Sequence, residues 1–215
     1  AHHNEGEVDR LMPRPNAETN TWLCDRGRMS YKALRAGDRL LKGFIKNGLI
    51  DLEPALGEAA ARIDEAGATA AILGSPWLSV EDNAALALLA AAMKTQNFCF
   101  DFKFETGIKD GILINKDPSP NAAGAALVKA AKGGLSLDEF RARLNSGAIK
   151  LVIAEARAAA LLKEELKASG ARLIAFATNR ADIPAGAYAT LPYASYFEVP
   201  GTFVNCQGLR RAVEP

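Results

Sequence analysis

The feature that most constrains the fold is a unit that occurs three times: an amphipathic stretch, a glycine and a short apolar run. The glycines are Gly67, Gly147 and Gly170. The apolar runs beside them lie at 69–73, 149–154 and 172–177. Glycine readily adopts the left-handed conformation that ends a helix and returns the chain to a sheet. Because helices that alternate with buried strands form parallel sheets, the sequence predicts a Rossmann-like, three-layer α/β domain with a mainly parallel sheet.

Apolar spacing and capping residues locate the helices. An apolar stripe begins at Leu52 and continues through Ile63, and a group of charged residues is assigned to the opposite side of that helix: Glu58, Arg62, Asp64 and Glu65. A helix over 80–94 begins after Ser79 and is apolar on nearly all sides, so we expect it to be packed between other elements. Ser136 and Glu139 have the spacing of a capping box that opens another helix.

The remaining elements are shorter or less marked. Further helices are expected at 120–132 and across 158–166, and short strands at 97–102 and 111–114. The tail after Gly201 alternates apolar and polar residues, which predicts a strand that either finishes the sheet or lies across it.

The first fifty residues have a different sequence pattern, without alternating helices and strands. A short strand is expected at 7–14, and a hairpin at 38–52 that turns at Asn47-Gly48, the strongest two-residue hairpin signal. We therefore predict a small β-rich segment over 1–51 and the α/β domain over 52–215.

Composition excludes several classes of protein. The net charge of +1 gives no electrostatic reason to expect nucleic acid or an anionic membrane as a partner. No apolar run approaches the roughly 20 residues that cross a bilayer, which predicts no direct membrane insertion and a cytoplasmic location. Three scattered cysteines fit a reducing compartment. A chain that begins with Ala1 rather than Met is expected to be a fragment of a longer one.

The residue types also exclude common catalytic sites. His2 and His3 are the only histidines and lie at the N-terminus, so a Ser-His-Asp or Cys-His arrangement inside the fold is not expected. No zinc spacing and no Gly-rich phosphate-binding motif occurs, and no carboxylate pair is singled out as catalytic. Ligands of such folds bind at the carboxyl ends of the strands. The segments there, 74–79, 154–157 and 177–182, are expected to be ordinary turns, with Ser79 as a helix cap.

Three segments together resemble one known family. They are RLMPRPNAETNTWLCDRGRMSYKAL at 10–34, GILINKDPSPNAAGA at 111–125 and FEVPGTFVNCQG at 197–208. In this order they resemble the end of the iron–sulfur segment and the adjoining molybdopterin-oxidoreductase-like domain of the large iron–sulfur subunit (the 75 kDa type) of respiratory complex I, the NADH:quinone oxidoreductase. The likeness extends to molybdopterin enzymes such as formate dehydrogenases.

The resemblance implies a metal ligand. Cys24 matches the last of four cysteines that hold a 4Fe-4S cluster in this family, so it is expected to ligate iron in the intact parent only. The other three ligands are missing, and Cys99 and Cys206 lie in the α/β part and do not replace them. A Cys-rich stretch is expected before Ala1. Three basic residues near Cys24 either offset an anionic cluster or solvate a helix start: Arg26, Arg28 and Lys32.

The resemblance also implies a function for the whole chain. No metal ligand of a molybdopterin enzyme stands in a matching motif, so the α/β domain is expected to have kept the fold without the molybdopterin, and catalysis by this chain alone is not expected. The first hypothesis is a scaffold beside an iron–sulfur chain, with other subunits of a respiratory or hydrogenase-type redox complex as partners. In such a complex the chain would be cytoplasmic or membrane-associated. The alternatives are a remnant of a molybdopterin enzyme that binds a pterin nucleotide, and a non-redox interaction module.

Overall fold

The computed structural model describes residues 1–17, 20–46, 48–102 and 108–214. These residues form two compact units. Unit 1 comprises Ala1–Arg39 and Lys103–Pro118, and unit 2 comprises Leu40–Phe102 and Ser119–Pro215. None of the helices in the described residues has the length and apolar character needed to span a bilayer.

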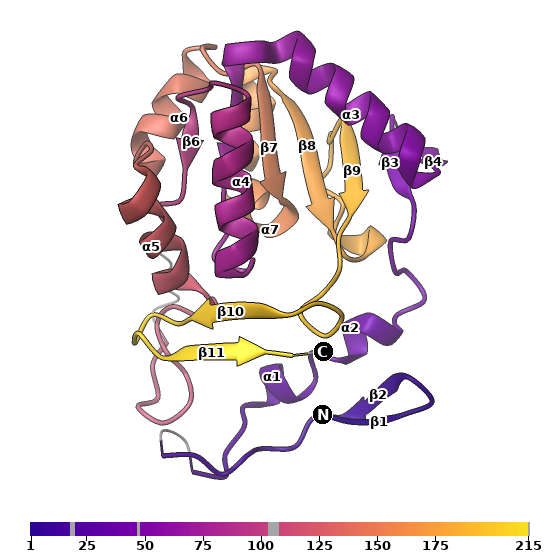
Figure 1. Ribbon diagram of the computed structural model, residues 1–215, viewed down its shortest axis with the longest axis vertical. Coiled ribbons are helices and arrows are strands. Elements are labelled where there is room, and N and C mark those ends of the chain that lie inside the picture. The colour runs from indigo at the N-terminus through magenta and orange to yellow at the C-terminus, as the bar shows by residue number, and fades with distance from the viewer. Residues whose placement is uncertain (18–19, 47, 103–107, 215) are drawn as a thin grey trace. The chain divides into compact units, whose positions relative to one another are not determined.

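Unit 2 is built on one central sheet. In the described residues it has seven strands in the order β4-β3-β9-β8-β7-β5-β6. The strands are β3 (Gly43–Ile45), β4 (Gly48–Ile50), β5 (Ala70–Leu73), β6 (Phe98–Cys99), β7 (Leu151–Glu155), β8 (Arg172–Ala177) and β9 (Ala189–Pro192). The five strands from β9 to β6 are parallel, whereas β3 runs antiparallel to β9 and to β4. The adjacent strands β7 and β5 are fully buried, and β7 lies beside β8 in the sheet (Figure 1).

Helices cover both faces of this sheet. They are α3 (Leu52–Ala66), α4 (Val80–Ala92), α5 (Ala122–Lys132), α6 (Leu137–Asn145), α7 (Ala156–Ala160) and α8 (Lys163–Ser169). Ile72, Ile153 and Ile174 point to the face that packs against α3, α4 and α5. The alternate residues Leu73 and Ala154 belong to the opposite core, with α6 to α8. Successive side chains of a strand face opposite sides, so the apolar runs bury both faces, and the expected three-layer α/β fold is confirmed.

The helix ends follow local sequence. The Ser79 hydroxyl accepts a hydrogen bond from the Asp82 amide at 3.0 Å, and Ser136 accepts one from the Glu139 amide at 3.2 Å. Both are complete capping boxes, as the spacing predicted for Ser136. Gly170 ends α8 with φ +67°, the left-handed turn that favours glycine.

Three expectations need correction. The stripe at 158–166 is divided between α7 and α8. The strand expected over 97–102 is limited to β6. The strand expected at 111–114 is absent, because the Asp110 carboxylate accepts hydrogen bonds of 2.8 Å from the amides of Ile112, Leu113 and Ile114 and so holds this part of unit 1 in a turn. Short polar side chains compete with the sheet ladder in this way.

The C-terminal strand lies outside the central sheet. β10 (Gly201–Val204) pairs with β11 (Arg210–Val213) in a separate antiparallel hairpin. The Thr202 amide donates to Glu81 of α4, and the Val204 amide donates to Asn121 before α5, both at 2.8 Å. The hairpin is therefore held beside α4 and α5 (Figure 1), and it does not finish the central sheet.

Unit 1 contains β1 (His2–Asn4), β2 (Glu7–Arg10), α1 (Asp25–Arg28) and α2 (Lys32–Arg35). The strand expected at 7–14 is present over 7–10 only, as β2. The hairpin expected at 38–52 is present as β3 and β4, which join the central sheet of unit 2. Of its turn, Asn47 lies outside the described residues.

Candidate functional site at the carboxyl ends of the central strands

The carboxyl ends of β5 and β7 carry a deeply buried polar cluster. Glu155 is the last residue of β7, with a side chain that is 2% exposed. Its Oε2 accepts hydrogen bonds from the Ser75 hydroxyl at 2.9 Å and from the Ala158 amide at 3.2 Å. Ser75 follows β5, so this carboxylate joins the ends of two adjacent parallel strands to the first turn of α7.

Burial dominates the electrostatics of this carboxyl group. Removal from water raises the pKa of Glu155, and the charge of Arg157, whose Nε lies 3.6 Å from Oε1, opposes that shift. Burial also raises the pKa of Tyr193, and the negative charge of Glu155 acts in the same direction. The Tyr193 phenol therefore stays protonated, and the raised pKa of Glu155 favours the protonated form of its carboxyl group.

Arg157 and Trp77 lie at the more accessible side of this cluster. The Arg157 side chain is 50% exposed, and its guanidinium carbon lies 5.8 Å from the centroid of the Trp77 ring. Such a cation–π contact orients both groups. The ion pair to Glu155 and the stacking on Trp77 thus fix the same arginine.

The loop after β5 is fixed by Asn83. Its Oδ1 accepts from the Ser75 amide at 2.9 Å, and its Nδ2 donates to the carbonyl oxygens of Ser75 and Ser79, each at 2.8 Å. A Cβ atom added at Gly74 would overlap Phe100 and the Asn83 side chain. Glycine is therefore required at this strand end because of close packing.

These residues do not fit the phosphates of a pterin nucleotide. Phosphate sites need free amide or hydroxyl donors and positive charge. Here the Ser75 amide is bound to Asn83, and the Ser75 hydroxyl and the Ala158 amide are bound to Glu155. The arrangement does fit a structural role, in which these hydrogen bonds join the neighbouring strands β5 and β7.

Sequence analysis found the segments but not the cluster. Ser79 is a helix cap as expected. Glu155 and Arg157 stood in the segment 154–157, and a single acid at the end of an apolar run is the signal that marks Glu155. The pairing with Ser75 depends on the order of strands β5 and β7, which no local pattern specifies.

Cys24 lies in unit 1 as the N-cap of α1. Its Sγ accepts a hydrogen bond from the Gly27 amide at 3.4 Å. Arg26 and Arg28 lie within α1, and Lys32 begins α2. Among the described residues, no group of three or more His, Cys, Asp or Glu side chains could hold a metal ion. The role of Cys24 as an iron ligand stays a prediction about the intact parent.

The other two cysteines belong to unit 2. Cys99 is buried in β6, and burial raises the pKa of its thiol to about 11. Cys206 is exposed in the turn between β10 and β11. Their environments differ, and neither belongs to a described metal-binding group.

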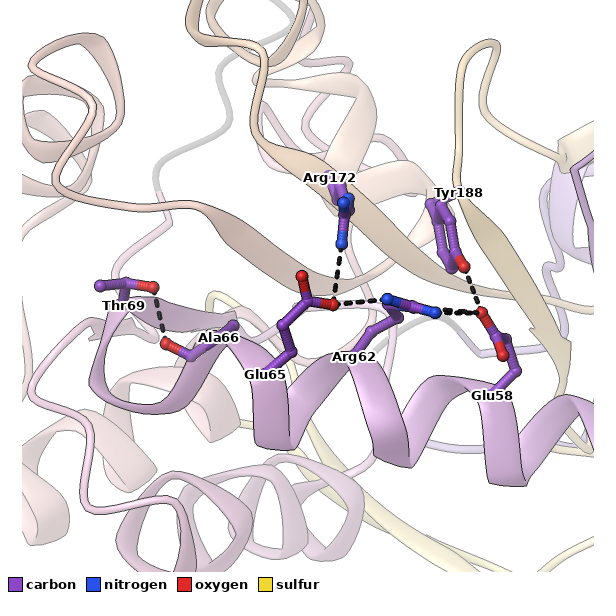
Figure 2. Close-up of polar contacts among 7 residues, drawn as sticks. All are labelled: Glu58, Arg62, Glu65, Ala66, Thr69, Arg172 and Tyr188. Carbon is purple, nitrogen blue, oxygen red and sulfur yellow. Dashed lines mark hydrogen bonds and ion pairs between the residues drawn. The ribbon is translucent and has the colours of Figure 1, made fainter.

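A second polar cluster joins α3 to the sheet (Figure 2). Arg62 pairs with Glu58 at 3.1 Å and also with Glu65. Arg172 of β8 reaches Glu65 at 3.1 Å, and the Tyr188 hydroxyl donates a hydrogen bond to Glu58. Glu58, Arg62 and Glu65 were assigned to the charged side of this helix. They connect α3 to β8 and to Tyr188, the residue before β9.

Three cations surround the ring of Tyr188 in this cluster. The ring centroid lies 5.7 Å from Lys46 Nζ, 5.6 Å from the guanidinium carbon of Arg62 and 5.5 Å from that of Arg172. Sequence spacing reveals the Glu58–Arg62 pair within one helix. The contribution of Arg172 and Tyr188 depends on tertiary packing and had no sequence signal.

Comparison with known proteins gives two relatives. No protein-family profile matches the chain. The chain is 31% identical over 105 residues to the G subunit of the NADH-quinone oxidoreductase of Streptomyces coelicolor, a match that covers 46% of this chain and 12% of that protein. It is 37% identical over 89 residues to the protein of the same name from Pseudomonas fluorescens, which covers 40% of this chain and 10% of that protein. The chain thus matches a small part of each relative.

Proposed function

We propose that this chain is part of an electron-transfer subunit of an NADH:quinone oxidoreductase, in which the α/β unit is a scaffold beside an iron–sulfur chain. The observation that carries the proposal is the similarity to two proteins that are each named as the G subunit of an NADH-quinone oxidoreductase. The other subunits of a respiratory or hydrogenase-type redox complex are the partners that this role implies. The location that follows is cytoplasmic, or membrane-associated through the complex.

A scaffold role agrees with the chemistry of the strand ends. Ser75, Glu155 and the Ala158 amide satisfy one another. Because the Ser75 hydroxyl and the Ala158 amide donate to Glu155, these donors stabilise the sheet and are not available to a phosphate-bearing ligand. This is the reason to prefer a scaffold over a pterin-binding remnant of an enzyme such as formate dehydrogenase.

Cys24 is proposed as the fourth ligand of a 4Fe-4S cluster in the intact parent. Iron is ligated by the thiolate form of cysteine. The Gly27 amide donates to the Cys24 sulfur, and such a donor suits a sulfur that ligates iron. One thiolate does not hold a cluster, so the remaining ligands belong to other parts of the parent.

The test uses the longest natural form of the protein, purified without oxygen. We expect about four iron atoms per such cluster, no molybdenum, and a reduced-cluster signal in electron paramagnetic resonance. Replacement Cys24→Ser should remove or alter this signal, whereas the control Cys206→Ser, at an exposed turn, should leave it unchanged. Equal iron content and an unchanged signal in both variants would contradict the ligand role.

Two other results would select the alternatives. Stoichiometric molybdenum or pterin in the natural form would overturn the scaffold in favour of the enzyme remnant. A natural form without any iron–sulfur cluster would leave a non-redox interaction module.

A further inference from the structure

The central sheet of unit 2 has two different edges. At one edge, β6 is followed outward by Leu135, whose amide donates a hydrogen bond to the Phe98 carbonyl oxygen at 2.8 Å. At the other edge, β4 pairs with β3 (Figure 1). Among the residues that the structure describes, no further strand pairs with β4. The outer side of β4 is therefore the edge at which this sheet can be extended.

The register of the neighbouring strands determines which backbone groups of β4 point outward. In an antiparallel ladder, opposite residues either exchange both hydrogen bonds or direct them both away from each other. The Lys46 amide donates to the Tyr188 carbonyl oxygen at 3.3 Å, so Lys46 directs its backbone groups toward β9. Phe44, two residues earlier in β3, does the same and lies opposite Leu49 of β4. Leu49 therefore directs its amide and carbonyl groups away from β3.

The residues of β4 do not oppose pairing with a like strand. Gly48, Leu49 and Ile50 carry no charge, and Leu49 is 44% exposed. Edge strands are commonly protected from pairing by charged residues, by proline or by a bulge. The three residues of β4 include neither a charge nor a proline, and their register with β3 is regular. Such an edge is suited to the addition of a strand.

A second copy of β4 is the strand that fits this edge. A two-fold axis at Leu49 places this residue opposite its own copy, and the outward amide and carbonyl groups then form two reciprocal hydrogen bonds. Lys46 precedes β4 and Asp51 follows it, so antiparallel pairing places the lysine of each copy near the aspartate of the other. Parallel pairing would place like charges together. The Asp51 carboxylate contacts Lys42 at 2.8 Å, but its side chain is 76% exposed, so a second cation can approach it.

We propose that β4 joins a second copy of this chain through its outer edge, as an antiparallel pair centred on Leu49, so that one sheet continues through both copies. The two Leu49 side chains then lie opposite each other, where apolar neighbours stabilise a strand pair. This inference goes beyond the redox assignment and does not depend on it, since it rests on the register of β3 and β4 and on the residues within and beside β4.

The test is sedimentation equilibrium of the full chain from about 1 μM to about 1 mM. The average mass should rise with concentration from the value of one chain to that of two chains and stop there, because a two-fold contact uses the edge once. Hydrogen exchange of the Leu49 amide should slow over the same range, since this amide is hydrogen-bonded only in the pair.

Substitutions at the axis test whether Leu49 pairs with its own copy. Leu49→Lys and Leu49→Glu each place like charges opposite each other and should raise the dissociation constant at least roughly tenfold. An equimolar mixture of these two variants places opposite charges together and should associate at least roughly tenfold more tightly than either variant alone. The control Leu88→Lys makes the same change on α4, at a leucine that is 62% exposed, and should leave the dissociation constant within about twofold.

Three results would overturn the proposal. The first is a chain that stays monomeric over the whole range of concentration. The second is an association that Leu88→Lys weakens as much as Leu49→Lys does. The third is a mixture of the two Leu49 variants that associates no better than either one alone. If a Leu49 variant loses the circular dichroism of the folded chain, the exchange of the Leu49 amide in the unmodified chain decides the outcome.

Discussion

The Ser75 hydroxyl donates a hydrogen bond of 2.9 Å to the Glu155 carboxylate, and this bond joins the ends of two parallel strands whose residues are 80 positions apart. Both side chains are buried, so each takes the place of water as the hydrogen-bond partner of the other. Buried polar groups stabilise a fold only when they are satisfied. Substitutions at this pair therefore measure how much its hydrogen bonds stabilise the ends of β5 and β7.

Replacement Glu155→Gln should change how the free energy of unfolding depends on pH. Burial raises the pKa of Glu155, so folding favours its protonated form. Its stabilising contribution is complete below the unfolded pKa and is lost as pH rises through the folded pKa. The stability of Glu155→Gln relative to the unmodified chain should therefore increase with pH, as measured by urea unfolding between pH 4 and pH 8.

Glu155→Ala provides the matched comparison, because it removes the acceptor as well as the charge. It leaves the Ser75 hydroxyl and the Ala158 amide unsatisfied and should be less stable than Glu155→Gln by about 1–3 kcal/mol. Equal stability of the two variants at every pH would show that these hydrogen bonds do not contribute.

Replacement Gly74→Ala should destabilise unit 2 by about 1–3 kcal/mol. The added methyl group would overlap the Phe100 ring and the Asn83 side chain. The control is Gly57→Ala on α3, where no atom lies within 4 Å of the added Cβ. That change should stabilise by about 0.5–1 kcal/mol. Thermal unfolding of both variants checks the opposite signs.

Replacement Asn121→Ala should loosen the β10–β11 hairpin. The Asn121 side chain donates to the Leu78 carbonyl oxygen at 2.7 Å and accepts from the Val204 amide at 2.8 Å. Loss of both bonds should cost about 2–4 kcal/mol and speed hydrogen exchange at Val204. Asn121→Asp keeps the acceptor, so its Val204 amide should stay better protected, and equal protection in the two variants would contradict this role.

Replacement Tyr188→Phe should raise the pKa of Glu58. The hydrogen bond from Tyr188 is the largest cause that lowers this pKa, followed by the bond from Arg62. Nuclear magnetic resonance titration of the Glu58 carboxyl group measures the change. Glu65, whose pKa is lowered by Arg62 and Arg172, is the internal control and should titrate as before.

Cys206 and Cys99 should differ in reactivity toward a maleimide. Cys206 is exposed, whereas Cys99 is buried with a pKa of about 11. Because the thiolate is the nucleophile, Cys206 should be labelled in the folded chain and Cys99 only on unfolding, as peptide mass spectrometry would show. Fast labelling of Cys99 in the folded Cys206→Ser variant would contradict the buried position of β6.

The sequence by itself determined the fold class and most helix ends. The continuous apolar runs of β5 and β7 are buried on both faces, and glycines such as Gly170 end helices through their own backbone freedom. Capping at Ser136 also depends on residues within one turn. These features are local, so a single sequence contains the information for them.

Only the tertiary structure decided which distant residues meet. The order of strands places Ser75 beside Glu155, and the packing of α3 places Glu58 beside Tyr188. The same folding placed the last strand in its own hairpin, because Glu81 and Asn121 satisfy the β10 edge that a longer sheet would otherwise use. Such contacts depend on the arrangement of whole elements, and each interaction contributes too little for a local pattern to reveal it.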